Sequence, residues 1–392
     1  MKLTILGATG SIGQSTLDLV RRSDGDLRVF ALTCANNIAQ AVADAREFRA
    51  AHVVTSDPLH YGALKEALAD TDITVHAGAQ AILDIAAYDV DMVVSAIVGA
   101  PGVAPSLAAL KAGNDVALAN KETMVCAGAL AKRIAAASGI QILPVDSEHS
   151  ALAQLLKDCA LRDVHHVDIT ASGGAFLNLT LDEMRHVTPE QAATHPNWDM
   201  GQRITIDSAS LFNKALEIIE AKELFDLTPS QINVVVHPQS IIHAAVHLVD
   251  GGSMLHMGLP DMRHAISYAL RRGERRDIGL GHASLIELGD LNFFAPDVQK
   301  YPAIPLAYAV MEQGGHCGAV FNAAKEVALD AFIAKEIPFL TMSEVVAQTL
   351  EIMSRQAEIT NDILDVKSVL EVNDRARQTA QRVIASGALC ID

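Results

Sequence analysis

Short apolar runs alternate with longer amphipathic stretches through the first 145 residues of the chain. The runs are rich in Val, Ile and Leu, which is typical of strands that helices cover on both faces. Alanine-rich stretches between them, such as Ala104–Gly113 and Ala127–Gly139, predict helices. This alternation predicts an α/β fold with a doubly wound parallel sheet. The expected strands are Leu3–Leu6, Val29–Thr33, His52–Thr55, Ile73–His76, Met92–Ser95, Asp115–Ala119 and Ile140–Val145.

The pattern changes after Asp146. We expect a helix from Glu148 to about Lys157, a strand over His166–Thr170 and a polar loop over Thr188–Arg203. A strongly periodic segment predicts one helix from about Ser208 to Leu224. Alternating segments around a Gly-Gly pair then predict a hairpin, and so a mixed or antiparallel sheet, from Val234–Val236, Ser240–Val249 and Ser253–Met257.

The last hundred residues contain an extended stretch followed by helices. Residues 290–304 have prolines close by and are expected to form a linker. From Pro305 to the end the pattern is helical, which predicts a small bundle.

The amino-acid composition limits the classes of binding partner that we expect for this chain. The 392 residues include 30 Lys and Arg against 47 Asp and Glu, a formal net charge of −17. That length exceeds what one hydrophobic core usually serves, so two or three domains are expected. An acidic chain lacks the basic footprint of a nucleic-acid binder and repels anionic lipid headgroups. No apolar stretch reaches the roughly 18 residues of a membrane span, so we expect neither a nucleic-acid partner nor a membrane partner.

The thiols and histidines indicate neither disulfides nor a zinc site. Five cysteines lie far apart and none forms Cys-x-x-Cys, so we expect reduced thiols. The chain opens directly on a predicted strand, which predicts no signal segment and a cytoplasmic location. No Cys/His cluster has zinc-ligand spacing. The histidines between positions 237 and 264 face alternately on predicted strands, so most are interpreted as solvated or core groups: His237, His243, His247, His256 and His264.

A glycine-rich turn follows the first strand. Its spacing is G-x-x-G-x-x-G, and a helix begins within it. Such glycines let the backbone approach a pyrophosphate, and the helix N-terminus attracts the anion. The alternative is an ordinary βα turn; the position at the first strand of a βαβ series favours a Rossmann-like cofactor site. The turn reads Gly7, Ala8, Thr9, Gly10, Ser11, Ile12 and Gly13.

The end of the second strand bears on the choice of cofactor. NAD-specific proteins carry an acidic residue there, close to the adenosine ribose. This chain has Thr33-Cys34-Ala35-Asn36-Asn37 and no acid, which favours NADP over NAD.

Two carboxylates follow the last strand of the predicted sheet. Asp146 and Glu148 are two residues apart, and on an extended chain they project to the same side. Oxygen ligands without cysteine favour a hard cation such as Mg²⁺ or Mn²⁺. The alternative is that Asp146 caps the next helix with Glu148 in its first turn. From these residues alone the two interpretations are about equal.

The periodic helix adds a second polar group. Glu217 shares a helix face with Asn213 and Lys214, because residues three and four apart are neighbours. We expect Glu217 as a third metal ligand, with Asn213, Lys214 and the hydroxyl of Ser208 holding a phosphate. A plain surface ion pair between Lys214 and Glu217 is the alternative.

Two loops complete the predicted site. Ser172-Gly173-Gly174 follows a strand and offers a hydroxyl with exposed N–H groups, which suits a phosphate; a plain turn is the alternative. The segment His195–Gly201 contains the only tryptophan, Trp198, on a loop with proline and glycine. It is expected to act as a closing lid, with a Trp that anchors the loop to the core as the alternative.

Taken together, these segments resemble the 1-deoxy-D-xylulose 5-phosphate reductoisomerases. The resemblance covers the chain from the first strand past residue 260, in the family's order, and is looser beyond that point. The segments that carry it are GATGSIGQSTLDL from Gly7, ALANKET from Ala117, PVDSEHSA from Pro144, TASGG from Thr170, HPNWDMGQRITIDSASLFNKALEIIEA from His195, VVHPQSIIHAAV from Val235 and PDMR from Pro260.

The resemblance implies an organisation and a chemistry. It implies an NADPH-binding Rossmann domain over residues 1–146, an α+β catalytic domain over 147–275 with a lid at about 188–203, a linker over 276–304 and a C-terminal helical domain over 305–392. It further implies a homodimer that needs NADPH and Mg²⁺, Mn²⁺ or Co²⁺. The phosphorylated ketose substrate would rearrange, most simply by retro-aldol and aldol steps, and be reduced to 2-C-methyl-D-erythritol 4-phosphate.

The resemblance also implies residue roles. Asp146, Glu148 and Glu217 match the metal ligands, and Glu217 is also placed next to the substrate. Glu148 and Lys121 are the expected catalytic residues. Ser172, Ser208, Asn213 and Lys214 match the phosphate grip, and Ser147 matches a contact to a substrate hydroxyl. His195, Trp198 and Met200 match the lid, His195 also contacts substrate, and His243 lines the pocket. The expected cofactor contacts are Gly7, Thr9, Gly10, Ser11, Ile12, Gly13, Ala35, Asn36, Asn37, Asn120, Lys121, Glu122 and Gly201.

The chain departs from the family pattern at three positions: Ala175 replaces a frequent Pro, Ala35 a frequent Gly, and Lys325 the usual Asn. Two rival functions stay open. One is another NADP-dependent oxidoreductase of a phosphorylated or acidic metabolite, similar to a semialdehyde dehydrogenase, whose nucleophile would be Cys126. The other is a non-catalytic NADPH sensor, which has no need for three carboxylates and a phosphate grip.

Overall fold

The computed structural model describes residues 1–195, 201–356, 359 and 361–387. The chain forms two compact units, each assembled from three separate segments. Unit 1 contains Met1–Thr123, Ala131–Ser150 and Asp261–Leu280; unit 2 contains Met124–Leu130, Ala151–Pro260 and Gly281–Asp392.

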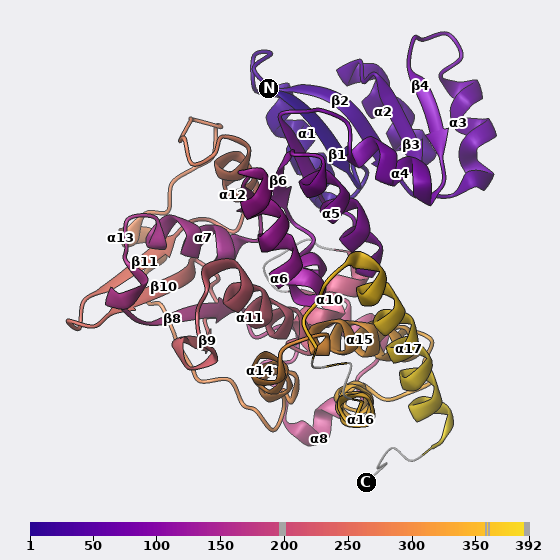
Figure 1. The fold of residues 1–392 in the computed structure, drawn as a ribbon. Helices are drawn as coiled ribbons and strands as arrows, with labels where there is room; N and C mark the ends of the chain where they lie inside the picture. The colour runs from indigo at the N-terminus through magenta and orange to yellow at the C-terminus, as the bar shows by residue number, and fades with distance from the viewer. Residues whose placement is uncertain (196–200, 357–358, 360, 388–392) are drawn as a thin grey trace. The chain divides into compact units, whose positions relative to one another are not determined.

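Unit 1 is built on a seven-stranded sheet of order β4-β3-β2-β1-β5-β6-β7. Figure 1 labels β1, β2, β3, β4 and β6 of this sheet. Every neighbouring pair is parallel, which confirms the predicted doubly wound sheet. The order reverses between β1 and β5, and ligands of such sheets bind outside the strand ends at that point. The strands are β1 (Lys2–Leu6), β2 (Arg28–Cys34), β3 (His52–Thr55), β4 (Thr74–Ala77), β5 (Met92–Ser95), β6 (Asp115–Leu118) and β7 (Ile142–Pro144).

Helices cover both faces of this sheet. α2 packs against α3, and α4 packs against α5. With the usual right-handed crossovers, this strand order places α1, α2 and α3 on one face and α4 and α5 on the other. All four residues of β5 are buried, as expected for a strand covered on both sides. The helices are α1 (Ser11–Arg21), α2 (Ile38–Phe48), α3 (Tyr61–Ala67), α4 (Ala79–Ala86), α5 (Val103–Lys111), α6 (Lys121–Ser138), α7 (Ser147–Leu156) and α12 (Met262–Leu270), with 3-10 turns at Pro58–His60 and Ala100–Gly102.

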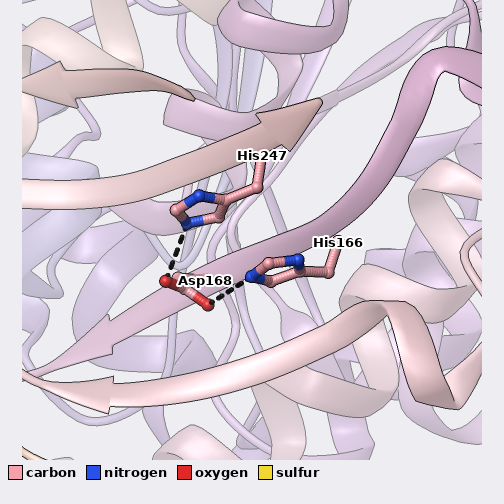
Figure 2. Close-up of side chains that lie close together, drawn as sticks. All are labelled: His166, Asp168 and His247. Carbon is pink, nitrogen blue, oxygen red and sulfur yellow. Dashed lines mark hydrogen bonds and ion pairs between the residues drawn. The ribbon is translucent and has the colours of Figure 1, made fainter. Parts of the chain in front are cut away.

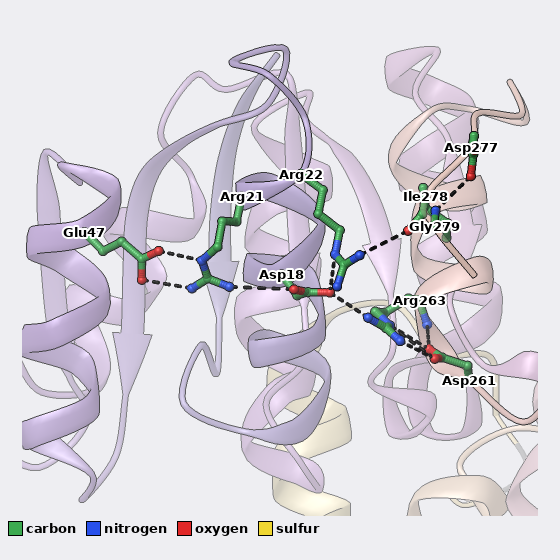
Figure 3. Close-up of polar contacts among 9 residues, drawn as sticks. All are labelled: Asp18, Arg21, Arg22, Glu47, Asp261, Arg263, Asp277, Ile278 and Gly279. Atoms are coloured by element: carbon green, nitrogen blue, oxygen red, sulfur yellow. Dashed lines mark hydrogen bonds and ion pairs between the residues drawn. The ribbon is translucent and has the colours of Figure 1, made fainter. Parts of the chain in front are cut away.

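The segment Asp261–Leu280 packs with unit 1, whereas the sequence analysis assigned residues 147–275 to the catalytic domain. Ile266 and Leu270 of α12 belong to the same hydrophobic core as the strands of the parallel sheet. At the surface, Arg263 Nη1 donates to Asp18 Oδ2 of α1 at 2.8 Å, and Arg22 reaches the Ile278 carbonyl (Figure 3). The Arg263–Asp18 contact joins residues more than 240 positions apart. A domain boundary predicted from local sequence pattern cannot take such a contact into account.

Unit 2 contains a four-stranded mixed sheet of order β11-β10-β8-β9. β10 pairs antiparallel with both β8 and β11, while β8 and β9 are parallel. The predicted hairpin and mixed sheet are therefore confirmed. The strands are β8 (Val164–Ala171), β9 (Ile232–Val236), β10 (Ile242–Leu248) and β11 (Ser253–Met257).

The helices of unit 2 include a C-terminal group in which α15 packs against both α16 and α17. α15 is buried along most of its length, so it forms the centre of that group. The helices are α8 (Leu181–Met184), α9 (Pro189–Ala192), α10 (Gln202–Ala209), α11 (Phe212–Phe225), α13 (Leu285–Leu288), α14 (Ala303–Gln313), α15 (Cys317–Ile333), α16 (Thr341–Ser354) and α17 (Val366–Ala385), with 3-10 turns at Leu161–Asp163 and Pro229–Gln231.

Three local predictions in unit 2 were wrong in part. The single helix predicted from Ser208 to Leu224 is two helices, because Leu211 between them has a left-handed backbone with φ 57°. The loop predicted over Thr188–Arg203 contains α9, which Thr188 caps reciprocally with Gln191. The linker predicted over residues 276–304 contains α13, and its Phe294 pairs with the edge of the mixed sheet at Val236.

Among the described residues, none of the helices has the length and apolar character needed to cross a membrane.

Candidate active site

The glycine-rich turn of unit 1 has the geometry of a cradle. Gly7 follows β1 with φ 81°, and a Cβ there would lie 2.6 Å from the Ala96 carbonyl oxygen after β5. A Cβ on Gly13 would lie 2.3 Å from the Ala8 carbonyl oxygen, so only glycine allows α1 to pack this closely. α1 begins at Ser11 without an acidic residue in its first turn. The turn therefore lies at the β1/β5 switch point, with a helix N-terminus able to receive an anion.

Several predicted cofactor residues have structural partners. Asn37 accepts a hydrogen bond from the Gln40 N–H and caps α2, while Ala35 and Asn36 are exposed. Asn120 caps α6 through its amide oxygen, and its amide nitrogen bonds the Ile97 carbonyl and Glu122. These contacts give Asn37 and Asn120 a role in shaping the turns that is independent of any ligand.

Asp146 lies at the start of α7 in unit 1. Its carboxylate accepts a hydrogen bond from Lys121 Nζ at 2.8 Å and a longer one, 3.3 Å, from the Glu148 N–H. His149 Nδ1 lies 3.3 Å from the same carboxylate, and its side chain is fully buried. The sequence analysis gave His149 no role, although its position three residues after Asp146 is the spacing of helical neighbours.

The spacing argument assumed that both carboxylates after β7 lie on extended chain. The structure differs from that assumption. β7 ends at Pro144 and Glu148 lies in the first turn of α7, so the capping arrangement is the one observed. Ser147 Oγ donates to Glu148 Oε2 at 2.5 Å. A carboxylate has about four lone-pair sites, so a capping role is compatible with cation binding by Asp146 and Glu148.

The predicted phosphate-binding turn in unit 2 packs directly on α10. Ser172 follows β8, and its Oγ lies 3.0 Å from His195 Nε2. Gly174, with φ 67°, lies so close to α10 that a Cβ would be 2.6 Å from the Ser208 carbonyl oxygen. Burial lowers the pKa of His195, which favours a neutral imidazole beside the serine. The structure therefore brings Ser172, His195 and the backbone of Ser208 together.

Glu217 and its two neighbours form a buried polar cluster on α11. Asn213 Nδ2 donates to Glu217 Oε1 at 2.5 Å, and Lys214 Nζ donates to Glu217 Oε2. The Lys214 and Glu217 side chains are only 4% and 1% exposed, so the interpretation as a surface ion pair was wrong. An amide nitrogen carries two protons and an ammonium three, so both side chains are of the donor type that binds anions.

The remaining predicted site residues are placed less directly. His243 is buried on β10, with its ring centroid 6.0 Å from that of His256. Gly201 is exposed at the start of α10. Trp198 and Met200 lie outside the described residues.

Lys325, which departs from the family pattern, has a clear partner. Its ammonium donates to Asp207 Oδ2 of α10 at 2.8 Å, and both side chains are buried. Asp207 immediately precedes Ser208, so this ion pair fixes the helix that carries a predicted phosphate ligand. Sequence reasoning missed it, because 118 residues separate the partners.

Three family models match the chain in succession. They describe 1-deoxy-D-xylulose 5-phosphate reductoisomerase at residues 3–128, its C-terminal domain at 142–225 and the DXP reductoisomerase C-terminal domain at 257–379. The 1-deoxy-D-xylulose 5-phosphate reductoisomerase of Ruegeria pomeroyi is 51% identical over 99% of this chain and 98% of that protein. That of Rhizobium meliloti is 47% identical over 98% and 97%.

Solved structures of 1-deoxy-D-xylulose 5-phosphate reductoisomerases are similar to this chain over 98% of its length. The reductoisomerase of Zymomonas mobilis in complex with NADPH has a TM-score of 0.90 and 38% identity, over 98% of both chains. A DOX-P reductoisomerase in complex with NADPH, fosmidomycin and magnesium has a TM-score of 0.92 and 37% identity, also over 98% of both.

Proposed function

The chain belongs to the 1-deoxy-D-xylulose 5-phosphate reductoisomerase family, and we propose that it converts 1-deoxy-D-xylulose 5-phosphate into 2-C-methyl-D-erythritol 4-phosphate with NADPH and a divalent cation. The observation that carries the proposal is the match of family models from residue 3 to residue 379, together with 51% identity to a relative along 99% of the chain. The predicted site residues within each unit have partners that suit their roles.

The glycine-rich turn of unit 1 fits a dinucleotide. Gly7 and Gly13 leave no room for a Cβ, and the N-terminus of α1 carries no competing carboxylate in its first turn. When bound, NADPH supplies the hydride for the reduction. The turn binds the pyrophosphate and orients the cofactor, and the absence of an acid at Ala35, Asn36 and Asn37 accommodates a 2′-phosphate.

The carboxylates fit a hard divalent cation. Asp146, Glu148 and Glu217 offer oxygen donors only, the chemistry that Mg²⁺ and Mn²⁺ prefer. When bound, the cation supplies Lewis-acid stabilisation of negative charge on substrate oxygens. Lys121 donates to the carboxylate of Asp146, and Lys214 and Asn213 donate to that of Glu217, so these donors fix the direction of the carboxylates.

The residues of unit 2 grip the substrate phosphate. The hydroxyls of Ser172 and Ser208 and the donors of Asn213 and Lys214 bind its oxygens. Gly174 packs so closely on α10 that a Cβ there would lie 2.6 Å from the Ser208 carbonyl oxygen, which brings the two serine segments together. His195 orients the Ser172 hydroxyl at 3.0 Å. This grip holds one end of the substrate while the other end reacts.

Two residues of unit 1 handle protons and substrate oxygens. Glu148, at the start of α7, is the proposed proton shuttle, and the Ser147 hydroxyl on its carboxylate orients it. The Lys121 ammonium polarises a substrate oxygen near the carboxylate of Asp146. Trp198 and Met200 keep the lid role that the family resemblance implies, and both lie outside the described residues.

The protein acts as a cytoplasmic homodimer in this proposal. The family resemblance supports the dimer. The four cysteines of the described residues form no disulfide, which fits a reducing compartment.

One assay tests the proposal. Purified protein is given deoxyxylulose phosphate and NADPH, and NADPH oxidation is followed with Mn²⁺ and with excess chelator. We expect substrate-dependent oxidation that chelator abolishes and Mn²⁺ restores. Oxidation that ignores either the ketose or the metal contradicts the proposal.

The semialdehyde-dehydrogenase alternative needs an accessible thiolate. Its candidate, Cys126, is 2% exposed in α6, and burial in apolar surroundings keeps a thiol inert. Activity that survives exhaustive alkylation of the native enzyme rejects this alternative.

A further inference from the structure

Three side chains meet on the mixed sheet of unit 2, apart from the residues of the proposed active site. His166 and Asp168 lie two residues apart on β8, and His247 lies opposite His166 on the antiparallel neighbour β10. Because side chains alternate along a strand, all three project from one face (Figure 2). Their ligand atoms lie within 4.8 Å of one another.

The atoms that meet are those that bind metals. His247 Nε2 lies 2.9 Å from Asp168 Oδ2, and His166 Nε2 lies 3.7 Å from Asp168 Oδ1. The two imidazoles are stacked, with centroids 4.3 Å apart and planes 10° from parallel. Stacking points both Nε2 atoms toward the same carboxylate, which gives two nitrogen donors and one oxygen donor on one side.

The far nitrogen of each ring also has a partner. His247 Nδ1 lies 2.8 Å from Ser253 Oγ on β11, and His166 Nδ1 lies 2.7 Å from His165 Nδ1. Metal-bound histidines almost always use the other ring nitrogen in such a contact, which fixes the ring orientation. Asn233 on β9 donates to Asp168 from the other side at 3.3 Å.

A simple cross-strand ion pair explains less of the arrangement of His166, Asp168 and His247 than a metal site does. Such a pair needs one histidine and one acid, and contributes at most about 1 kcal/mol on an exposed sheet face. Here a second imidazole stacks on the first, although two histidines that both gain protons repel each other. The side chains are between 21% and 28% exposed, so an ion from solvent can reach them.

We propose that His166, Asp168 and His247 form a second metal site, which binds a borderline transition-metal ion, Zn²⁺ in the first instance. Imidazole nitrogen suits Zn²⁺, whereas Mg²⁺ prefers an all-oxygen shell. The site is chemically distinct from the carboxylates Asp146, Glu148 and Glu217. It joins β8 to β10, so the ion stabilises the sheet that carries Ser172 at the end of β8.

The test is a zinc titration of the full-length protein in excess Mg²⁺, with affinity measured by competition against a chromophoric chelator. The variants are His166→Gln, Asp168→Asn and His247→Gln, with His282→Gln, an exposed histidine in the loop before α13, as the matched control. We expect each ligand variant to lose about 100-fold or more in zinc affinity and the control to lose none. Ser253→Ala, which removes a contact to a ligand ring, loses about tenfold.

A second variant separates this proposal from the proposed function. Glu217→Gln removes a carboxylate of the catalytic set and leaves the sheet site intact, so it is expected to keep one high-affinity zinc. Zinc raises the melting temperature of wild type and Glu217→Gln but not of His247→Gln. Equal zinc affinity in wild type and all three ligand variants overturns the proposal, as does zinc binding that disappears in Glu217→Gln. Circular dichroism without zinc checks that each variant is folded.

Discussion

Unit 2 contains two buried lysine–carboxylate pairs that look alike and differ in what they join. Lys214 and Glu217 lie on one helix, three residues apart, and Asn213 also donates to the carboxylate. Lys325 and Asp207 lie on α15 and α10, and 118 residues separate them. Each lysine side chain is 4% exposed.

The difference shows that burial of charge does not by itself indicate function. Within one helix, the Lys214–Glu217 contact holds no elements together, so its burial makes sense if the carboxylate and the ammonium meet ligands. The Lys325–Asp207 contact fixes two helices to each other, so a structural role suffices. Removing one partner should therefore affect activity in the first pair and stability in the second.

The largest effect is expected from Glu217→Gln. An amide is a poor ligand for a hard cation, and Lewis-acid stabilisation is worth several kcal/mol, so metal-dependent turnover should fall by about 10³-fold or more. NADPH binding, measured by fluorescence, should persist because the glycine-rich turn is in unit 1. Glu223→Gln, on the same helix and partly exposed, is the control with normal turnover. Turnover of Glu217→Gln near the control value would remove Glu217 from the ligand set.

The next effect is on stability. Lys325→Met leaves Asp207 buried without its cation, which costs about 3–5 kcal/mol and lowers the melting temperature. Lys335→Met removes a partner from an exposed pair with Glu190 and should leave the melting temperature nearly unchanged. Scanning calorimetry of both variants gives the comparison. Equal melting temperatures for the two variants would mean that the Lys325–Asp207 pair does not hold α10 and α15 together.

The smallest effect is expected from Lys214→Ala. It distinguishes a role in substrate binding from a role in the chemical step. Lys214→Ala removes a charged donor to the substrate phosphate, which is worth about 1.5–3 kcal/mol, so KM should rise about 10- to 100-fold with a smaller change in kcat. Lys222→Ala, on the same helix, is the control with unchanged KM. Steady-state kinetics with deoxyxylulose phosphate measure both constants. A drop in kcat at constant KM would place Lys214 with the reacting atoms and away from the phosphate.

Local pattern was enough for most of the parallel sheet. Most of its strands contain a short apolar run, and His52–Thr55 and Met92–Ser95 were predicted to the residue. The glycine spacing predicted the turn after β1. Glycine lacks a Cβ, so its positions in the sequence indicate where two backbone segments can lie in close contact.

What the sequence did not reveal depends on contacts between distant residues. The Lys325–Asp207 pair, the docking of α12 on α1 and the meeting of His166 with His247 all join residues more than 80 positions apart. The histidines were analysed within positions 237–264 alone, so the register that sets His247 opposite His166 was out of reach. His149 was missed for another reason: a fully buried histidine and a solvated one look the same in sequence.

The left-handed conformation of Leu211 affects the directions in which the residues on either side of it point around the helix axis. In an uninterrupted helix, Ser208 and Asn213 would point about 140° apart around the axis, because each residue turns about 100°. A non-glycine residue in that conformation costs on the order of 1 kcal/mol, and Leu211 is 2% exposed, so its apolar contacts offset the strain. The buried Leu211 thus interrupts the helical repeat. The direction in which Ser208 points is therefore not tied to that of Asn213.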